Sequence, residues 1–293
     1  MTSVAFLGLG LMGSRMAKRL LMSGHQVTVW DQLPERAESL AAVGATTALS
    51  PAGAVAGAQF VVSMLADPPA LEQVVFGEQG CASALCEGHT MIEMSTMGPR
   101  TIRELRFRLP KAVRLIDAPV RGSLPEAEAG ALIIMVGATI KDFAIVEPLL
   151  ACLGVPIRVG GPGSGAAMKL AVNLSLGGVV AALGEALALA TALGVDSGIA
   201  LDILGDAPWG GVIRSRRTML ERGQFPPQLR LGLATKDFHL IAEAAQATSR
   251  QVPVARAVLG WLQQAEMTFG ADVDFASIIA IMNAPRDRGP EVR

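Results

Sequence analysis

The sequence carries little charge of either sign and few of the residues that build metal sites or disulfides. Its formal net charge of -1 gives no broad positive field to attract a polyphosphate, so we do not expect nucleic acid as a partner. Only three cysteines occur, and they lack the spacing of a disulfide framework or of a metal site: Cys81, Cys86 and Cys152. This scarcity favours a reducing, cytoplasmic compartment.

The sequence also gives no basis for a hydrolase, a metalloenzyme or an exported protein. The three histidines are scattered, and none adjoins a serine or cysteine in a nucleophile motif, so we expect neither hydrolysis nor a catalytic metal. Met1–Ser3 leads directly into an apolar strand pattern, without the basic region and cleavage site of an export signal. We therefore expect no export.

Apolar residues, in contrast, are abundant. They make up 51% of the chain against 17% for charged residues, so much apolar surface must be hidden inside the fold or between subunits. We expect a homodimer or a higher homo-oligomer. The segment from Leu170 to Leu193 has the length of a membrane span, but it contains Asn173 and Glu185 and is rich in glycine and alanine. A helix buried in protein explains it better, and we expect no membrane partner.

Short apolar runs alternate with amphipathic stretches in the first half of the chain, which predicts strands joined by crossover helices. The expected strands are 4–7, 26–30, 60–64, 91–94, 114–117, 132–136 and 157–159. After a glycine-rich break at 160–165, the pattern is helical without strands. The expected helices there are 166–193, 197–204, 233–247 and 253–269.

The chain is long enough for two domains. The sequence predicts an α/β fold: a Rossmann-type doubly wound sheet over residues 1–162 and an all-helical substrate and dimerisation domain over 163–285. A long helix at about 165–193 joins them. The charged, proline-bearing tail, 286–293, is expected to be disordered.

The glycine motif Gly8-Leu9-Gly10-Leu11-Met12-Gly13 lies between the first strand and a helical pattern. In this spacing Gly8 permits a tight turn, Gly10 lets the backbone approach a pyrophosphate, and Gly13 lets helix and strand pack closely. The phosphates would lie at the helix N-terminus, where unpaired N–H groups and the helix dipole favour an anion. The motif therefore predicts a dinucleotide site.

Asp31 ends the second expected strand and can accept hydrogen bonds from an adenosine ribose. Its carboxylate would repel a 2′-phosphate, so NAD is favoured over NADP. Arg36 is either a solvated arginine at a helix start or a residue close enough to complicate this preference, and NADP stays open.

Lys169 and Asn173 are four residues apart in the predicted long helix and therefore lie on one face. The small residues before them leave room for a ring. A partly desolvated lysine has a lowered pKa, which suits it to donate a proton to a carbonyl and to remove one from a hydroxyl. Asn173 can hold the substrate oxygen in line. On spacing alone, a buried structural pair with compensating hydrogen bonds is an equal alternative.

Four motifs occur here in the order in which the β-hydroxyacid dehydrogenases carry them, and the chain resembles that family over residues 4 to 282. They are the glycine motif, Asp117-Ala118-Pro119-Val120-Arg121-Gly122-Ser123, the segment Gly163 to Asn173, and Lys236-Asp237. The resemblance implies an NAD(P)-dependent oxidoreductase that acts on a small 3-hydroxy acid or its semialdehyde or keto form. It also implies a dimer in which the partner's helical domain grips the long helix.

The resemblance also implies roles for individual residues. Lys169 matches the family's catalytic lysine, and Asn173 matches the asparagine that positions the substrate. The residues implied to bind substrate are Ser95, Thr96, Arg121, Gly122, Ser123, Lys236 and Asp237. Those implied to bind the cofactor are Gly8, Leu9, Gly10, Leu11, Met12, Gly13, Asp31, Met64, Leu65, Thr96 and Lys236.

One segment departs from the family pattern. Many members carry Ser-Gly-Gly where this chain has Arg121-Gly122-Ser123, so the substrate cannot be copied from them. Pointing inward, Arg121 can bind a second carboxylate or a phosphoryl-type group with its planar fork; pointing outward, it is a solvated arginine.

Two other functions are open at this stage. An imine reductase shares the architecture but usually lacks lysine at the position of Lys169. A non-catalytic nucleotide-binding scaffold would keep the fold and lose turnover. Lys169 favours carbonyl and alcohol chemistry over both.

Overall fold

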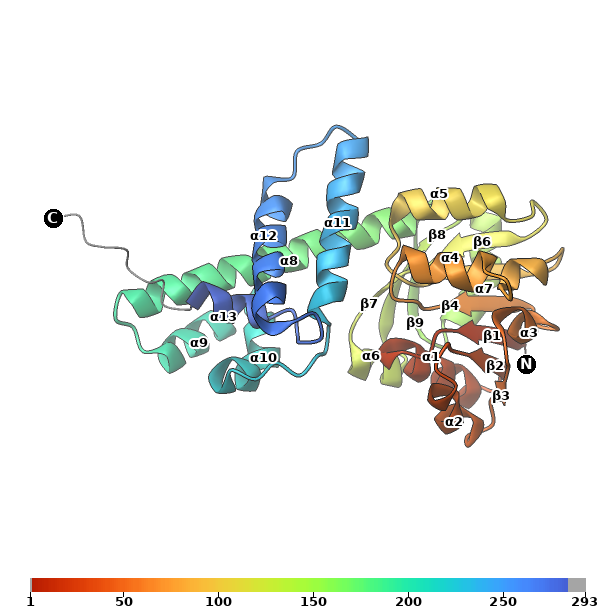
Figure 1. Ribbon diagram of the computed structural model, residues 1–293, viewed down its shortest axis with the longest axis horizontal. Coiled ribbons are helices and arrows are strands. Elements are labelled where there is room, and N and C mark those ends of the chain that lie inside the picture. Colours follow the sequence, from red (N-terminus) through yellow and green to blue (C-terminus); the bar gives the residue numbers. More distant parts are fainter. Residues whose placement is uncertain (1, 284–293) are drawn as a thin grey trace. The chain divides into compact units, whose positions relative to one another are not determined.

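The computed structural model describes residues 2–283, which fall into two compact units divided between Val172 and Asn173 (Figure 1). The first unit is an α/β fold with a mostly parallel sheet, and the second is helical, as the sequence predicts. The domain limits 1–162 and 163–285 stay a proposal. The tail predicted for 286–293 lies outside the described residues.

The strands are β1 (Ser3–Leu7), β2 (Gln26–Trp30), β3 (Thr46–Thr47), β4 (Phe60–Ser63), β5 (Thr90–Glu93), β6 (Arg114–Asp117), β7 (Val120–Arg121), β8 (Leu132–Gly137) and β9 (Gly154–Gly160). The helices of the first unit are α1 (Leu11–Met22), α2 (Glu35–Ala41), α3 (Pro51–Val55), α4 (Pro68–Phe76), the 3-10 turn η1 (Cys81–Ser83), α5 (Gly98–Arg108), α6 (Leu124–Ala129) and α7 (Ile140–Leu150). Helix α8 (Ser164–Ala192) continues from the first unit into the second. The second unit then holds α9 (Ser197–Asp206), α10 (Gly211–Arg222), α11 (Leu231–Ala247), α12 (Pro253–Phe269) and α13 (Ser277–Asn283).

The strands form one sheet in the order β3-β2-β1-β4-β5-β6-β8-β7, with β9 paired to β8. Strands β1 to β6 run parallel, and β8 is antiparallel to both β6 and β7. Because the chain winds outward from β1 in both directions, the strand order reverses between β1 and β4. The carboxyl ends of parallel strands at such a reversal are where nucleotide sites form in this architecture.

Each face of the sheet is covered by helices and has its own apolar core. On one face, Phe6 and Ile92 pack with α1, α2 and α7. On the other face, Leu7 and Met91 pack with α3, α4 and α5. Because both faces are buried, the central strands are almost continuously apolar, which is why the sequence reveals them as short apolar runs.

The predicted strands and the long helix are confirmed, and the elements that the sequence did not reveal are short or polar. Strands β3 and β7 have two residues each, too few to show an alternating pattern. Helix α10 is rich in arginine, and its single fully buried residue, Ile213, gives no apolar stripe.

Helix α8 is long and apolar enough to cross a membrane by length and composition, with a third of its most apolar window buried. Core helices of soluble proteins pass the same test. In the helical unit, side chains of other helices pack closely against α8 at two of its glycines. A Cβ at Gly177 would collide with Phe238 of α11, and one at Gly184 would collide with Met282 of α13.

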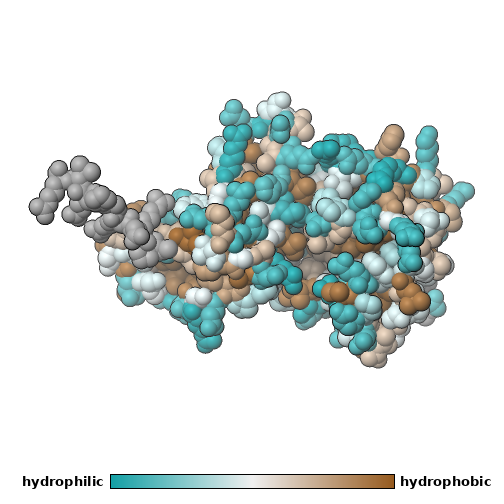
Figure 2. All heavy atoms as spheres, viewed as in Figure 1, coloured by the Kyte–Doolittle hydropathy of each residue, from teal (hydrophilic) through white to brown (hydrophobic). Residues whose placement is uncertain are grey.

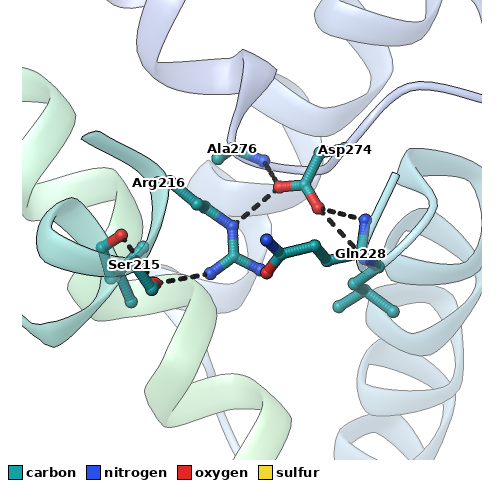
Figure 3. Close-up of polar contacts among 7 residues, drawn as sticks. Ser215, Arg216, Gln228, Asp274 and Ala276 are labelled. Atoms are coloured by element: carbon teal, nitrogen blue, oxygen red, sulfur yellow. Dashed lines mark hydrogen bonds and ion pairs between the residues drawn. The ribbon is translucent and has the colours of Figure 1, made fainter. Parts of the chain in front are cut away.

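A buried aspartate organises the loops of the helical unit (Figure 3). Asp274 is fully buried; it pairs with the Arg216 guanidinium at 2.8 Å and accepts the N–H groups of Gln228, Leu229 and Ala276. Arg216 also lies over the ring of Phe275. Arg216 is therefore an internal ion-pair partner of the helical unit rather than a solvated arginine of α10.

Replacing Asp274 should therefore destabilise the helical unit strongly. Asp274→Ala leaves the largely buried Arg216 without its partner and three N–H groups without an acceptor, so we expect a loss of about 3–5 kcal/mol in the free energy of unfolding. Urea unfolding measures it. The matched control is Asp202→Ala, because Asp202 is 71% exposed in its pair with Arg217 and should cost less than about 1 kcal/mol. Equal losses in the two variants are incompatible with this assignment.

Candidate active site

The predicted site residues of the first unit gather at one edge of the sheet. The loops after β1, β4, β5 and β6 leave the carboxyl ends of strands that are neighbours in the sheet. These loops carry the glycine motif, Met64–Leu65, Ser95–Thr96 and the segment that begins at Asp117. Strand order thus brings together segments that are far apart in the chain, from Gly8 to Asp117.

The glycine motif has the geometry that the sequence predicts. Gly8 has a φ of 98°, and a Cβ there would lie 2.8 Å from the Leu65 side chain. A Cβ at Gly13 would collide with the carbonyl oxygen of Gly8, whereas Gly10 has nothing within 4 Å. Helix α1 begins without a side-chain cap and without an acidic residue in its first turn. The open space at Gly10 and the uncapped N–H groups fit a dinucleotide pyrophosphate.

Asp31 is buried and is held by donors of its own chain. One oxygen accepts the N–H of Leu9 at 2.7 Å; the other accepts the N–H of Leu33 at 2.9 Å and pairs with Arg36 at 3.3 Å. The carboxylate therefore ties the glycine motif to the end of β2. Arg36, the residue that kept NADP open in the sequence, is its ion-pair partner.

A second buried carboxylate lies at the end of β5. Glu93 is fully buried; its Oε2 accepts the Ser63 hydroxyl, and its Oε1 accepts the N–H of Ser95 at 2.7 Å. The Ser95 hydroxyl oxygen in turn accepts the N–H of Leu65 at 2.7 Å. Burial raises the pKa of the neighbouring Cys81 thiol to about 12, and the Glu93 charge adds to the rise.

A third buried carboxylate, Asp117 at the end of β6, caps the start of α8. Its two oxygens accept the N–H groups of Gly163 at 2.7 Å and Ala166 at 2.8 Å. Burial raises the pKa of the Asp117 carboxyl, although these N–H groups favour its charged form. A Cβ at Gly137 or Gly165 would collide with Asp117, so both glycines are needed for this close approach.

Lys169 lies on α8 three residues beyond Ala166 and is half-buried. One helical turn therefore separates it from the N–H group that Asp117 holds. The position of the lysine thus follows from the position of the capped helix start.

In the helical unit, Asp237 links two other predicted site residues. Its Oδ2 accepts the Asn173 side-chain N–H at 2.6 Å, and its Oδ1 pairs with the Lys236 ammonium at 2.8 Å. Because the Asn173 nitrogen faces Asp237, the orientation of its amide is set. The three residues form one cluster of this unit.

In the segment after β6, Ser123 makes hydrogen bonds within the chain. Both the N–H and the hydroxyl of Ser123 donate to Glu126 at 2.7 Å, and these bonds lower the pKa of the Glu126 carboxyl. The Ser123 donors are thus already engaged within the chain. Arg121 is exposed on β7, and its role stays a prediction.

Sequence reasoning missed Ser63, Glu93 and the linking role of Asp237. The available signal for Glu93 was a carboxylate at the last position of an apolar strand, directly before the predicted Ser95–Thr96 loop. In the part of the chain that the structure describes, no group of three or more His, Cys, Asp or Glu residues is arranged to hold a metal ion.

Known proteins resemble this chain along almost its whole length. Residues 3–161 match a family model described as the NAD binding domain of 6-phosphogluconate dehydrogenase. Residues 163–282 match one described as NAD-binding of NADP-dependent 3-hydroxyisobutyrate dehydrogenase.

Individual relatives agree with the family models. The chain is 32% identical to glyoxylate/succinic semialdehyde reductase 1 of Arabidopsis thaliana, over 97% of this chain and 99% of the relative. It is 32% identical to the 3-hydroxyisobutyrate dehydrogenase of Pseudomonas aeruginosa, over 95% and 97%. The solved structure of Mycobacterium tuberculosis 3-hydroxyisobutyrate dehydrogenase with L-serine has a TM-score of 0.85 at 27% identity, and the match covers 97% of this chain and 100% of that one.

Removing the cap of α8 should disturb both stability and turnover. Asp117→Ala leaves two buried N–H groups without an acceptor, which costs about 1–3 kcal/mol for each. It also frees the helix start that places Lys169, so kcat should fall. Asp117→Asn keeps one acceptor oxygen, so its stability and its kcat should both fall less than in Asp117→Ala. Urea unfolding measures the stability, and steady-state kinetics measures kcat.

Asp196→Ala is the matched control, because Asp196 caps the exposed start of α9 through the N–H of Ile199. It should cost about 1 kcal/mol and leave kcat unchanged. The account of Asp117 is wrong if kcat in Asp117→Ala equals that of the control.

Proposed function

Because this chain belongs to the β-hydroxyacid dehydrogenase family and is an NAD(P)-dependent oxidoreductase of hydroxy acids and semialdehydes, we propose that Lys169 transfers the proton in its reaction. The substrate is a small 3-hydroxy acid or its semialdehyde or keto form. The observation that carries the proposal is the capped start of α8, because Asp117 fixes the helix one turn before Lys169.

The lysine ammonium donates a proton to the substrate carbonyl oxygen during reduction, and the neutral amine removes a proton from the hydroxyl during oxidation. When bound, the nicotinamide supplies or accepts the hydride. Asn173 positions the same substrate oxygen, and Asp237 supports this role because it holds the Asn173 amide in one orientation. Lys236 is proposed to contact both cofactor and substrate.

The substrate carboxylate is held by Ser95, Thr96 and the backbone of Gly122. Ser123 was expected to share this task, but its donors already serve Glu126, so its part is the smaller one. Arg121 is exposed and is available to a second acid group on a larger substrate.

NAD is the preferred cofactor. Asp31 is a buried carboxylate at the end of β2, and it would repel a 2′-phosphate placed beside it. Arg36 is paired with Asp31, so binding a 2′-phosphate would require that ion pair to open. Gly8 to Gly13 cradle the pyrophosphate, and Met64 and Leu65 line the cofactor from the loop after β4. The enzyme is expected in the cytoplasm.

The enzyme is a homodimer in this proposal, joined through its helical unit. Apolar residues reach the surface over that unit in the space-filling view (Figure 2). A groove of about 510 Å³ runs between one face of α8 and the start of α12, lined among others by Val179, Ala182 and Val254. Only a third of the apolar window of α8 is buried in the single chain, and a second copy would cover more of it.

A charge in this groove should separate the subunits without unfolding them. Val254 is 55% exposed in the single chain, so Val254→Glu should leave the fold intact and convert the dimer to a 30.4 kDa monomer in light scattering. Val43→Glu is the matched control, because Val43 is 52% exposed in the first unit, and it should stay dimeric. A monomeric wild-type protein contradicts the proposed dimer.

Turnover of a substrate panel tests the proposed function. We expect the wild-type enzyme to oxidise or reduce at least one small 3-hydroxy acid or semialdehyde, with a higher kcat/KM for NAD(H) than for NADP(H), as followed by the absorbance of the reduced nicotinamide. Lys169→Met should lower kcat by about 10²- to 10⁴-fold, because the proton donor is removed. Its dissociation constant for the reduced cofactor should not change.

The matched control is Lys141→Met, because Lys141 is exposed on α7 and outside the site. It should keep wild-type turnover. Undiminished turnover in Lys169→Met would contradict the role of Lys169 in proton transfer. If no compound of the panel is turned over, the proposed substrate class is wrong.

A further inference from the structure

Glu93 is a fully buried carboxylate at the end of β5, where its register neighbours in the sheet are Ser63 of β4 and Asp117 of β6. Burying a carboxylate is costly unless hydrogen bonds satisfy it. An apolar residue of similar volume would leave the Ser95 N–H and the Ser63 hydroxyl without this acceptor. The bonds that Glu93 accepts therefore define what this carboxylate does.

These bonds join two loops of the site. Ser63 and Glu93 are directly opposite each other where the parallel strands β4 and β5 end, and the Ser63 hydroxyl donates to Glu93. One step further, Glu93 accepts the Ser95 N–H and Ser95 accepts the Leu65 N–H, both at 2.7 Å. We call the four residues Ser63, Glu93, Ser95 and Leu65 the carboxylate brace.

The brace ends against the glycine turn. A Cβ at Gly8 would meet the Met64 carbonyl oxygen and would lie 2.8 Å from the Leu65 side chain, so the loop after β4 packs directly on that turn. At its other end, the brace includes Ser95, which lies in the same loop as Thr96. The brace therefore connects the loop packed on the dinucleotide turn with the loop proposed to hold the substrate.

We propose that Glu93 is a positioning residue that sets the spacing between these two loops, and thus between cofactor and substrate. The expected effect of Glu93 on turnover rests on the proposed function. Glu93 contacts neither reactant; it acts through Ser95 and Leu65. Hydride transfer requires the reacting atoms to be held about 3–3.5 Å apart, so a small shift of one loop is enough to lower the rate.

The amide variant separates geometry from charge. In Glu93→Gln the side-chain oxygen can still accept the Ser95 N–H, while the new amide nitrogen donates to Ser63, whose hydroxyl reverses from donor to acceptor. In Glu93→Ala both connections are lost. In the double variant Ser63→Ala/Glu93→Gln the amide nitrogen loses the Ser63 hydroxyl as its acceptor.

Steady-state kinetics gives the first readout. Glu93→Ala should lower kcat by about 100-fold through misplacement of the loops. Glu93→Gln should restore kcat to within about fivefold of wild type because the Ser63 hydroxyl can turn, and the double variant should lose that rescue. Cys81→Ala is the control, because Cys81 is buried beside Glu93 and has no bond to either loop; it should lower stability but not kcat.

Hydrogen exchange of the Leu65 amide gives a readout that needs no turnover. Exchange should be fast in Glu93→Ala and slow in wild type and Glu93→Gln, relative to the amide of Val62 inside β4. General loss of stability would instead speed both amides together, as we expect for Cys81→Ala.

The results that overturn the inference are distinct from those that overturn the proposed function. Wild-type kcat in Glu93→Ala, or equal acceleration of Leu65 and Val62, makes Glu93 merely structural. A Glu93→Gln variant as defective as Glu93→Ala shows that charge, not spacing, is required. If the wild-type enzyme turns over no substrate, the proposed function fails, and Leu65 exchange still decides whether the brace holds the loop.

Discussion

The hydrogen bonds from the start of α8 to the buried carboxylate of Asp117 are the constraint on which the site depends. They fix the first turn of a 29-residue helix to the end of β6, through Gly163 and Ala166. Gly137 and Gly165 make this approach possible, because a Cβ at Gly137 would collide with the carboxylate and one at Gly165 with the backbone carbonyl oxygens of Met135 and Asp117. These bonds set the position of Lys169 on α8, and the proposed proton transfer depends on that position.

Asp117 is one of three buried carboxylates at strand ends that accept backbone N–H groups of the site loops. Asp31, Glu93 and Asp117 lie at the carboxyl ends of β2, β5 and β6. Asp31 and Asp117 accept backbone N–H groups from segments far away in the sequence, and Glu93 accepts the N–H of Ser95, two residues later. A buried anion strongly disfavours loss of these bonds, since its charge would then be left unsatisfied. The loops around the site are therefore held by electrostatics at the strand ends, while apolar packing holds the sheet beneath them.

The sequence predicted what depends on local pattern. Apolar runs revealed β1, β2 and β4 to β6, and the spacing of Gly8, Gly10 and Gly13 revealed the turn that leads into α1. The resemblance of four ordered motifs pointed to the family. Partners that meet only in the folded chain were not readable: nothing in the sequence pairs Asp31 with Leu9, Asn173 with Asp237, or Arg216 with Asp274. The bonds from Ser123 to Glu126 are different, because a serine followed three residues later by a glutamate is the local pattern of a helix capping box.

Chemical rescue tests the central claim most directly, namely that the amine of Lys169 carries the proton. Lys169→Ala removes the amine and leaves a space on α8, which a small primary amine in solution can enter. We expect the variant to bind the reduced cofactor normally, to turn over slowly, and to recover turnover as the ethylamine concentration is raised. An unrescued Lys169→Ala that still turns over its substrate at the wild-type rate would contradict the account.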